Sequence, residues 1–296
     1  MDISIVIASG AGGEFLVNCL DSLNTQASNP DIEVIVVDRF GDNHASQIKE
    51  KYTFVNVITP ELDHPPSVPE LRKIGVENAK GDIVAIIEEH CLAPSNWVDS
   101  IKMSFHNIDA AIGGPIIDDN YLRLTDWAVY FSEYHNYLPP WEKGNRYGLN
   151  GANIAYNRDY LLKHLEALSL GFWEVVLHPS LVEDGNFRAV PEMGVKHTGP
   201  FGYLYYLRQR YLLSRVWGGT QREIVSTSKR ILYLVLAPIL PIFILYRISR
   251  RVTLHKRLRS KFLLVLPQMI PIVLAYVIGE WSGYLIGVGR SLEHVE

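Results

Sequence analysis

Residues 69–97 read PELRKIGVENAKGDIVAIIEEHCLAPSNW, and this stretch determines the expected class of fold. It predicts a helix over 69–79, since Ser67 can cap the first turn and a proline suits the start of a helix. The uninterrupted apolar run over 83–87 is typical of a strand buried on both faces of a parallel sheet. A second helix is predicted over 94–105. Helix, strand and helix with short connections indicate βαβ units.

The residues before this stretch continue the same alternation. Strands are predicted where β-branched residues run together, and helices where apolar residues recur on one face. The expected strands are 3–8, 33–37 and 55–58, a glycine-rich loop covers 9–13, and helices carry Phe15 to Leu23 and residues 45–51. The sequence therefore predicts an α/β fold with a mostly parallel sheet flanked by helices. In such folds, ligands bind beyond the carboxyl ends of the strands.

The two parts of the chain differ in charge. Residues 1–200 carry 14 Lys and Arg against 28 Asp and Glu, whereas residues 201–296 carry 14 against 4. A basic, apolar C-terminal third indicates contact with anionic lipids, and no nucleic acid is expected because the basic residues flank apolar runs. Only two cysteines are present, and the N-terminus resembles a buried strand more than a signal peptide. We therefore expect the front domain in the cytosol.

Three segments are expected: a catalytic domain over 1–200, amphipathic interfacial helices over 201–230, and a membrane-associated helical segment over 231–296. The apolar runs 231–246 and 262–279 each contain two prolines, and seven basic residues separate them. Because the first run is short and both its flanks are basic, we favour two re-entrant or in-plane hairpins kinked at the prolines. A transmembrane helical hairpin and a buried helix pair of a soluble protein are the alternatives.

Polar side chains follow two of the predicted strands. Asp38 can accept a hydrogen bond from a base or a ribose, although a helix cap is an equal alternative. Glu88, Glu89 and His90 can hold a divalent cation that neutralises a diphosphate, with an exposed turn as the alternative. An imidazole ligand favours Mn²⁺ over Mg²⁺. Glu174, which follows two aromatic residues, can act as a general base.

Taken in order, several motifs over residues 1–200 resemble those of the family-2 glycosyltransferases, which share the Rossmann-like GT-A fold. The matching segments are ISIVIAS, FLVNCLDSLNTQ, IEVIVVD, the stretch quoted above, LNGANIAYNRDYL, FWEVVLHPSL and EMGVKH. The family's tyrosine in the first loop is missing, since Gly10 stands there.

The resemblance implies a role for individual residues. Asp38 would bind the base, Glu174 would be the catalytic base, and His197 would complete a metal site. The family's Asp-x-Asp metal motif falls on Glu88 and His90, so this chain departs from the pattern. The implied set is Ala8, Ser9, Asp38, Arg72, Glu88 and Glu89 for the nucleotide; Glu88, His90 and His197 for the metal; Asn150, Gly151, Asn153 and Trp173 for the donor sugar and acceptor; and Glu174 for catalysis.

The function implied by the resemblance is an inverting sugar transfer from a nucleotide sugar, with a UDP-sugar favoured as the donor. The expected membrane segment, and not the resemblance, suggests the acceptor: a lipid-linked or other saccharide of surface polysaccharide or glycolipid synthesis, at the cytoplasmic face of the cell membrane. A divalent cation, Mn²⁺ or Mg²⁺, is the expected cofactor. One alternative is a nucleotidyl- or phosphotransferase using Lys73, but no phosphate-binding GxxxxGK loop occurs. The other is a catalytically inactive, membrane-bound scaffold that binds nucleotide sugars.

Overall fold

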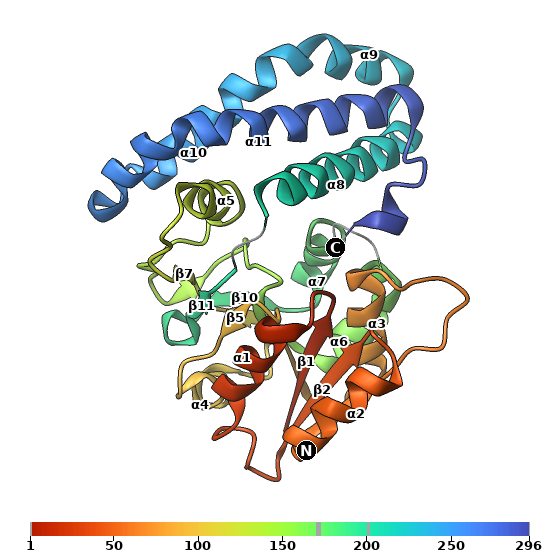
Figure 1. The fold of residues 1–296 in the computed structure, drawn as a ribbon, viewed down its shortest axis with the longest axis vertical. Coiled ribbons are helices and arrows are strands. Elements are labelled where there is room, and N and C mark those ends of the chain that lie inside the picture. Colours follow the sequence, from red (N-terminus) through yellow and green to blue (C-terminus); the bar gives the residue numbers. More distant parts are fainter. Residues whose placement is uncertain (1, 170–172, 200–201, 296) are drawn as a thin grey trace. The chain divides into compact units, whose positions relative to one another are not determined.

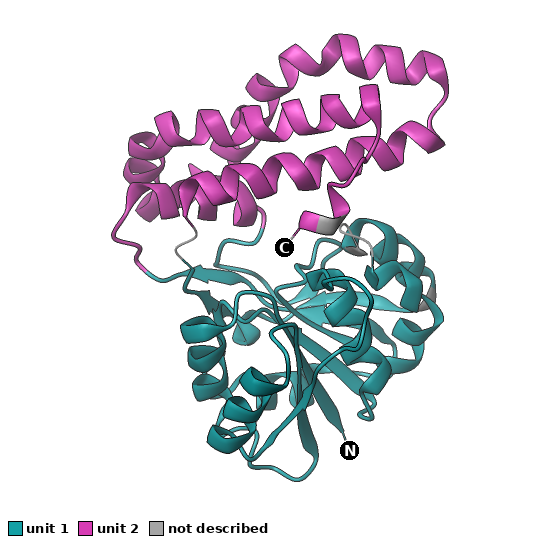
Figure 2. Ribbon diagram, turned by 45° about the vertical axis from the view of Figure 1, so that its right-hand side comes forward, with its two compact units in different colours: residues 1–119, 137–199 teal, residues 120–136, 200–296 magenta. Residues whose placement is uncertain are grey.

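The fold is taken from a computed structural model, which describes residues 2–169, 173–199 and 202–295. The chain forms two compact units, coloured separately in Figure 2. Unit 1 comprises residues 1–119 and 137–199, and unit 2 comprises residues 120–136 and 200–296. The second unit therefore takes in a short segment from the middle of the sequence as well as the C-terminal third.

Unit 1 is an α/β unit, and its helices and some of its strands are labelled in Figure 1. Its strands are β1 (Ile3–Ser9), β2 (Ile32–Asp38), β3 (Val55–Ile58), β4 (Ile83–Ile87), β5 (Cys91–Leu92), β6 (Asp109–Gly113), β7 (Ile116–Asp118), β8 (Gly144–Asn145), β9 (Asn153–Asn157), β10 (Asn186–Ala189) and β11 (Val195–His197). Its helices are α1 (Gly13–Leu23), α2 (Asp42–Lys51), α3 (Val68–Asn78), α4 (Trp97–Ser104), α6 (Arg158–Lys163) and α7 (Trp173–Asp184), with 3-10 turns at Leu165–Ser169 and Pro191–Met193.

The main sheet has eight strands among the described residues, in the order β3-β2-β1-β4-β9-β6-β10-β8. The first four strands are parallel, as predicted, and β6 and β10 are parallel as well. The strand β9 runs antiparallel between β4 and β6. The prediction of a mostly parallel sheet flanked by helices is therefore confirmed, with β9 and β8 as the antiparallel members.

The parallel register places polar residues at one edge of this sheet. Ser9 at the end of β1 pairs with Asp38 at the end of β2, and Glu88 directly follows β4 on the other side of β1. A separate three-stranded sheet has the order β5-β11-β7 and aligns His197 with Cys91 and with Asp118. This small sheet therefore fixes His197 beside the residue that follows His90.

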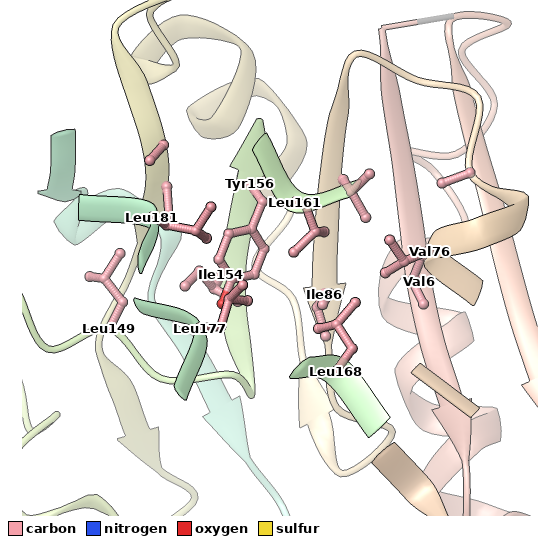
Figure 3. Close-up of a cluster of buried hydrophobic side chains, with 14 of the residues drawn as sticks. Val6, Val76, Ile86, Leu149, Ile154, Tyr156, Leu161, Leu168, Leu177 and Leu181 are labelled. Atoms are coloured by element: carbon pink, nitrogen blue, oxygen red, sulfur yellow. The ribbon is translucent and has the colours of Figure 1, made fainter. Parts of the chain in front are cut away.

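Packing around the main sheet explains why the local predictions succeed. Ser67 caps α3 in a capping box with Glu70, which satisfies backbone N–H groups of the first turn. A Cβ at Gly75 would lie 2.4 Å from Val6, so glycine allows α3 to lie directly on the sheet. Figure 3 shows part of the core, in which Tyr156 of β9 packs among leucine and isoleucine side chains. This core holds the strand ends in fixed positions.

Unit 2 is helical. It contains α5 (Leu124–Tyr134), α8 (Tyr203–Ile224), α9 (Thr227–Leu236), α10 (Leu240–Val252) and α11 (Arg259–Ile286), with 3-10 turns at Ala237–Ile239, Lys256–Leu258 and Leu292–His294. Glycines bring the backbones of α8 and α11 together: a Cβ on Gly279 would lie 2.2 Å from the Tyr211 carbonyl oxygen, and one on Gly283 would lie 2.4 Å from that of Arg215. The ion pair of Arg210 with Glu133 connects α8 to α5.

The two apolar runs of the sequence form long helices. Residues 227–252 and 256–286 are long and apolar enough to cross a membrane by length and composition, each with a mean hydropathy of 2.2. Only 11% of the apolar window in the first is buried within the protein, against 39% in the second. The first is interrupted by a 3-10 turn that contains Pro238. The expectation of a hairpin in the second run is wrong, because α11 continues through Pro267 and Pro271 as one helix.

Candidate active site

The carboxylate of Asp38 lies inside unit 1 at the end of β2. It is fully buried, and its Oδ1 accepts hydrogen bonds from Ser9 Oγ at 2.8 Å and from His44 Nδ1 at 2.9 Å. Its other oxygen, Oδ2, is buried and has no hydrogen-bond partner among the described residues. Ala8, which precedes Ser9 on β1, is also buried. Asp38 therefore presents one acceptor oxygen that the protein itself leaves unused, which is costly unless a ligand completes it.

An ion pair lies at the end of β4, across β1 from Asp38. Arg72 on α3 donates from Nη2 to Glu88 Oε1 at 2.9 Å, and the side chains of Arg72 and Glu88 are 11% and 27% exposed. Both charged groups were predicted to be near the nucleotide, and the fold brings them into contact with each other. The Arg72 guanidinium is largely buried, and guanidinium is a group whose geometry matches phosphate oxygens.

Glu89 contacts the glycine-rich loop between β1 and α1. Its carboxylate accepts hydrogen bonds from the backbone N–H groups of Gly10 at 2.9 Å, Ala11 at 2.5 Å and Gly12 at 2.8 Å. The side chain is 3% exposed, and burial raises the pKa of its carboxyl although the three N–H groups oppose that shift. Successive N–H groups of this kind form an anion-binding nest. Glu89 occupies the nest and holds the loop from within the protein.

His90 and His197 lie next to each other, with ring centroids 6.1 Å apart. Burial lowers the pKa of His90 to about 4 and that of His197 to about 3, so both imidazoles are neutral at pH 7. Neutral imidazole is the form that binds metal ions. No cluster of three or more His, Cys, Asp or Glu side chains suited to a metal occurs in the described parts of the chain. The pair therefore fits a cation in ligand type alone.

Glu174 lies in the first turn of α7 and reaches the Asn-Gly-Ala-Asn segment that leads into β9. Its Oε1 accepts a hydrogen bond from the N–H group of Gly151 at 3.2 Å. Asn150 Oδ1 accepts from the N–H of Ala152 at 2.9 Å and shapes the same turn. The side chain of Trp173 lies outside the described residues. The predicted base and the predicted sugar-binding segment thus meet, although they are separated in the sequence.

Asn153 is placed differently from its neighbours in this segment. It is fully buried, its Oδ1 accepts from Trp97 Nε1 at 2.9 Å, and its Nδ2 donates to the Met193 carbonyl oxygen at 2.7 Å. Its amide connects β9 to α4 and to the turn before β11. Asn153 therefore supports the Asn-Gly-Ala-Asn segment from inside unit 1.

Three polar residues of this region were not predicted. His44 pairs with Asp38, and Tyr156 OH is 2.8 Å from His178 Nε2. His178 is four residues after Glu174, so both lie on one face of α7. The helical spacing of Glu174 and His178 was a usable signal in the sequence, whereas the pairing of His178 with a strand residue depends on the tertiary fold.

Comparisons with known proteins bear on the family and the fold of the chain. Residues 4–165, more than half of the chain, match the family model described as glycosyl transferase family 2. A crystal structure of S. aureus TarS 1–349 in complex with UDP-GlcNAc is similar, with a TM-score of 0.53 and 14% identity over 96% of this chain and 92% of that one. The mannosyltransferase PcManGT from Pyrobaculum calidifontis, in complex with GDP-Man and Mn²⁺, has a TM-score of 0.53 and 13% identity over 94% of this chain and 86% of that one.

At these identities, the two structures establish the shared fold alone. A comparison with curated protein sequences finds no match. The family model covers β1 to α6, which includes the Asp38 carboxylate, the Arg72–Glu88 ion pair and His90. The chain therefore belongs to glycosyl transferase family 2, the inverting, nucleotide-sugar-dependent glycosyltransferases.

Proposed function

We propose that the protein transfers a sugar, with inversion, from a UDP-sugar to a lipid-linked saccharide acceptor at the cytoplasmic face of the cell membrane, and that Glu174 is the catalytic base. The observation that carries the proposal is the contact of Glu174 Oε1 with the Gly151 N–H at 3.2 Å. It places a carboxylate against the segment that we assign to the donor sugar and acceptor.

The donor side of the site is assigned to the ends of β1, β2 and β4. The free Oδ2 of Asp38 is suited to a base N–H, since a carboxylate only accepts hydrogen bonds. Ala8 and Ser9 form the neighbouring backbone, and Glu88 is suited to ribose hydroxyl groups while it orients Arg72. The Arg72 guanidinium can stabilise the charge that develops on the leaving diphosphate.

His90 and His197 are the residues that we assign to a divalent cation. Their neutral imidazoles and the 6.1 Å separation of the ring centroids fit two ligands of one ion. Glu88 is a weaker candidate for this role because its carboxylate is paired with Arg72. A bound cation would neutralise charge on the diphosphate, and Mn²⁺ accepts imidazole more readily than Mg²⁺ does.

The chemical step is a single displacement at the anomeric carbon. Glu174 takes the proton of the acceptor hydroxyl while the hydroxyl oxygen attacks and the bond to the diphosphate breaks. The Gly151 N–H holds one carboxylate oxygen of Glu174, which orients the other for the proton. Asn150 and Gly151 form the turn beside it, Asn153 supports that turn from inside the protein, and Trp173 is the proposed sugar-stacking residue next to Glu174.

The membrane assignment is supported by unit 2 alone. The helices α9 and α10 and the 3-10 turn between them expose apolar side chains to the surface: Ile231, Leu232, Val235, Leu236, Ile239, Ile242 and Phe243. Exposed apolar surface of this extent needs a partner, and lipid matches its chemistry. Basic residues follow at Arg250 and Arg251, where anionic headgroups would lie. A protein held there meets lipid-linked acceptors directly. In this proposal, residues 201–230 lie at the interface and residues 231–296 are embedded.

The test of this proposal is sugar transfer by Glu174→Gln. The variant keeps a side chain that can accept from Gly151 but cannot take a proton, so we expect at least about a hundredfold loss of turnover with unchanged donor affinity. Glu183→Gln, in the same helix, is the matched control and should retain wild-type turnover. Full turnover by Glu174→Gln would disprove the assignment of the base. Donor binding by the wild type without any turnover would support the inactive scaffold instead.

A further inference from the structure

Only one oxygen of the buried Asp38 carboxylate has hydrogen-bond partners among the described residues. Oδ1 already accepts from Ser9 and from His44, at 2.8 and 2.9 Å. Oδ2 is buried and unpartnered among the described residues. Since a carboxylate donates no hydrogen bond, the Nδ1 of His44 carries the proton in this pair. His44 and Ser9 therefore fix the plane of the carboxylate and direct Oδ2 toward a single donor.

Phe40 is an exposed aromatic side chain that contacts His44, the hydrogen-bond partner of Asp38. It follows Asp38 by two residues and is 48% exposed. Its ring contacts His44 edge-on, with centroids 5.3 Å apart, and the Arg39 guanidinium lies 5.6 Å from its centre. A Cβ built on Gly12 would lie 2.8 Å from the Phe40 ring, so the β1–α1 loop passes directly over this side chain. That loop, residues 10–13, has no aromatic residue of its own.

We propose that Phe40 and His44 complete the subsite for the base of the donor. This inference rests on the proposed function. Phe40 supplies the stacking face, and His44 is a positioning residue that acts through Asp38. Asp38 Oδ2 then accepts from a ring N–H of the base. Uracil and guanine carry such a group, whereas the ring nitrogens of cytosine and adenine on the pairing edge are acceptors and would be repelled by the carboxylate.

Because Oδ2 is buried, the base can reach it only after a local rearrangement. His44 is held by its hydrogen bond to Asp38, while the contacts described for Phe40 are with rings, a guanidinium and the Gly12 backbone. Phe40 can therefore change its side-chain rotamer without losing a hydrogen bond in these contacts. Such rearrangements of side chains are common when a ligand binds.

The first arm of the test measures the affinity of UDP for Phe40 variants of the full chain in detergent. Phe40→Ala should weaken UDP binding by about tenfold, the size expected for a lost base–aromatic contact. Phe40→Trp should bind UDP as the wild type does. Phe40→Leu keeps an apolar side chain but has no aromatic face, so its affinity for UDP should resemble that of Phe40→Ala. Met103→Ala, at another exposed apolar side chain, is the control. Wild-type affinity for UDP in Phe40→Ala would overturn the stacking role.

The second arm compares UDP, GDP, CDP and ADP, which separates a positioning role of His44 from a structural one. The wild type should prefer UDP or GDP over CDP and ADP by about tenfold or more. His44→Leu should reduce this ratio to about threefold or less, while His44→Asn, whose amide N–H can still reach Asp38, should restore it. An unchanged ratio in His44→Leu would overturn the inference while the proposed function stands. Failure of the wild type to bind any of the four nucleotides would refute both.

Discussion

Replacement of Glu89 tests whether a carboxylate inside the protein holds the loop between β1 and α1. In the wild type, Oε1 accepts from Gly10 and Ala11, and Oε2 accepts from Gly12. Gly10 and Gly12 are buried, whereas Ala11 is exposed and can bond to water instead. Glu89→Ala therefore leaves two buried N–H groups unsatisfied, at about 1–3 kcal/mol each. We expect a total loss of about 2–6 kcal/mol, a large part of the stability of a domain.

Glu89→Gln is the sharper variant because it keeps the shape of the side chain. Its carbonyl oxygen can replace Oε1, but its NH₂ group faces the N–H of Gly12, so one of the three hydrogen bonds is lost. The expected cost is about 1–3 kcal/mol. Amide hydrogen exchange of residues 10–12 should accelerate in Glu89→Gln, and the KM for the donor should rise more than kcat falls. Unchanged exchange at these amides would refute the reasoning.

The pH dependence of stability is a second test of the buried Glu89 carboxyl. Burial raises the pKa of this carboxyl in the folded protein, so the folded state holds its proton at pH values where the unfolded chain has released it. The contribution of Glu89 to stability is therefore complete below the ordinary glutamate pKa and declines as pH rises through the raised value. Urea unfolding of the wild type should show this decline, and Glu89→Gln should lack it. If the stabilities of the wild type and of Glu89→Gln changed with pH in parallel, the raised pKa of Glu89 would be contradicted.

Three further predictions concern the rest of the molecule. Gly283→Leu should destabilise the helical unit by about 1–3 kcal/mol or more through overpacking, because the Cβ alone would lie 2.4 Å from the Arg215 carbonyl oxygen. Thermal unfolding followed by circular dichroism measures the loss of stability, and Leu274→Ala at an exposed site is the control. The double charge reversal Arg250→Glu and Arg251→Glu should reduce flotation with anionic vesicles by about tenfold or more, since each basic residue contributes roughly 1 kcal/mol to the binding of an anionic membrane. High salt should reduce the flotation of the wild type in the same way. Equal flotation of the wild type and the double variant would contradict a contact with lipid headgroups. His178 has a pKa lowered to about 4 by burial, so the wild type should lose about 3 kcal/mol of stability as pH falls from 6.5 toward 4, and His178→Phe should lose less over that range.

The sequence was sufficient to predict the helices and strands whose apolar residues follow a clear pattern. The strands β1 to β4 and the helices α1 and α3 match their predicted ranges to within a few residues, because buried parallel strands are continuous apolar runs and helices carry one apolar face. The Ser67 cap also formed as predicted. These features depend on neighbours in the sequence, which is why local patterns were enough.

Elements that depend on distant partners were not predictable in this way. The strands β5, β7 and β8 have two or three residues, too few to show any period. The antiparallel insertion of β9 between β4 and β6 is decided by pairing across the sheet. Residues 120–136 belong to the helical unit, although the charge and hydropathy of the chain change only near residue 200.

In the candidate site, too, some positions could be predicted from local sequence patterns and others could not. The positions of Asp38 and Glu88 followed from the rule that parallel strands share one carboxyl edge. The partner of Glu89 was missed, because backbone N–H groups of a loop leave no mark in the side-chain sequence. His44 was missed because it lies in the first turn of a polar helix, where a solvated residue is the ordinary expectation.

The most direct test of the proposed sugar transfer is donor turnover by the purified full chain in vesicles that contain lipid-linked saccharide acceptors. Release of nucleoside diphosphate would be measured across UDP-, GDP-, CDP- and ADP-sugars, with and without Mn²⁺, and the anomeric configuration of the product would be read by NMR. We predict that a UDP-sugar is consumed, that Mn²⁺ increases turnover, and that the product has the configuration opposite to that of the donor. Retention of configuration, or no turnover of any donor under either condition, would contradict the account.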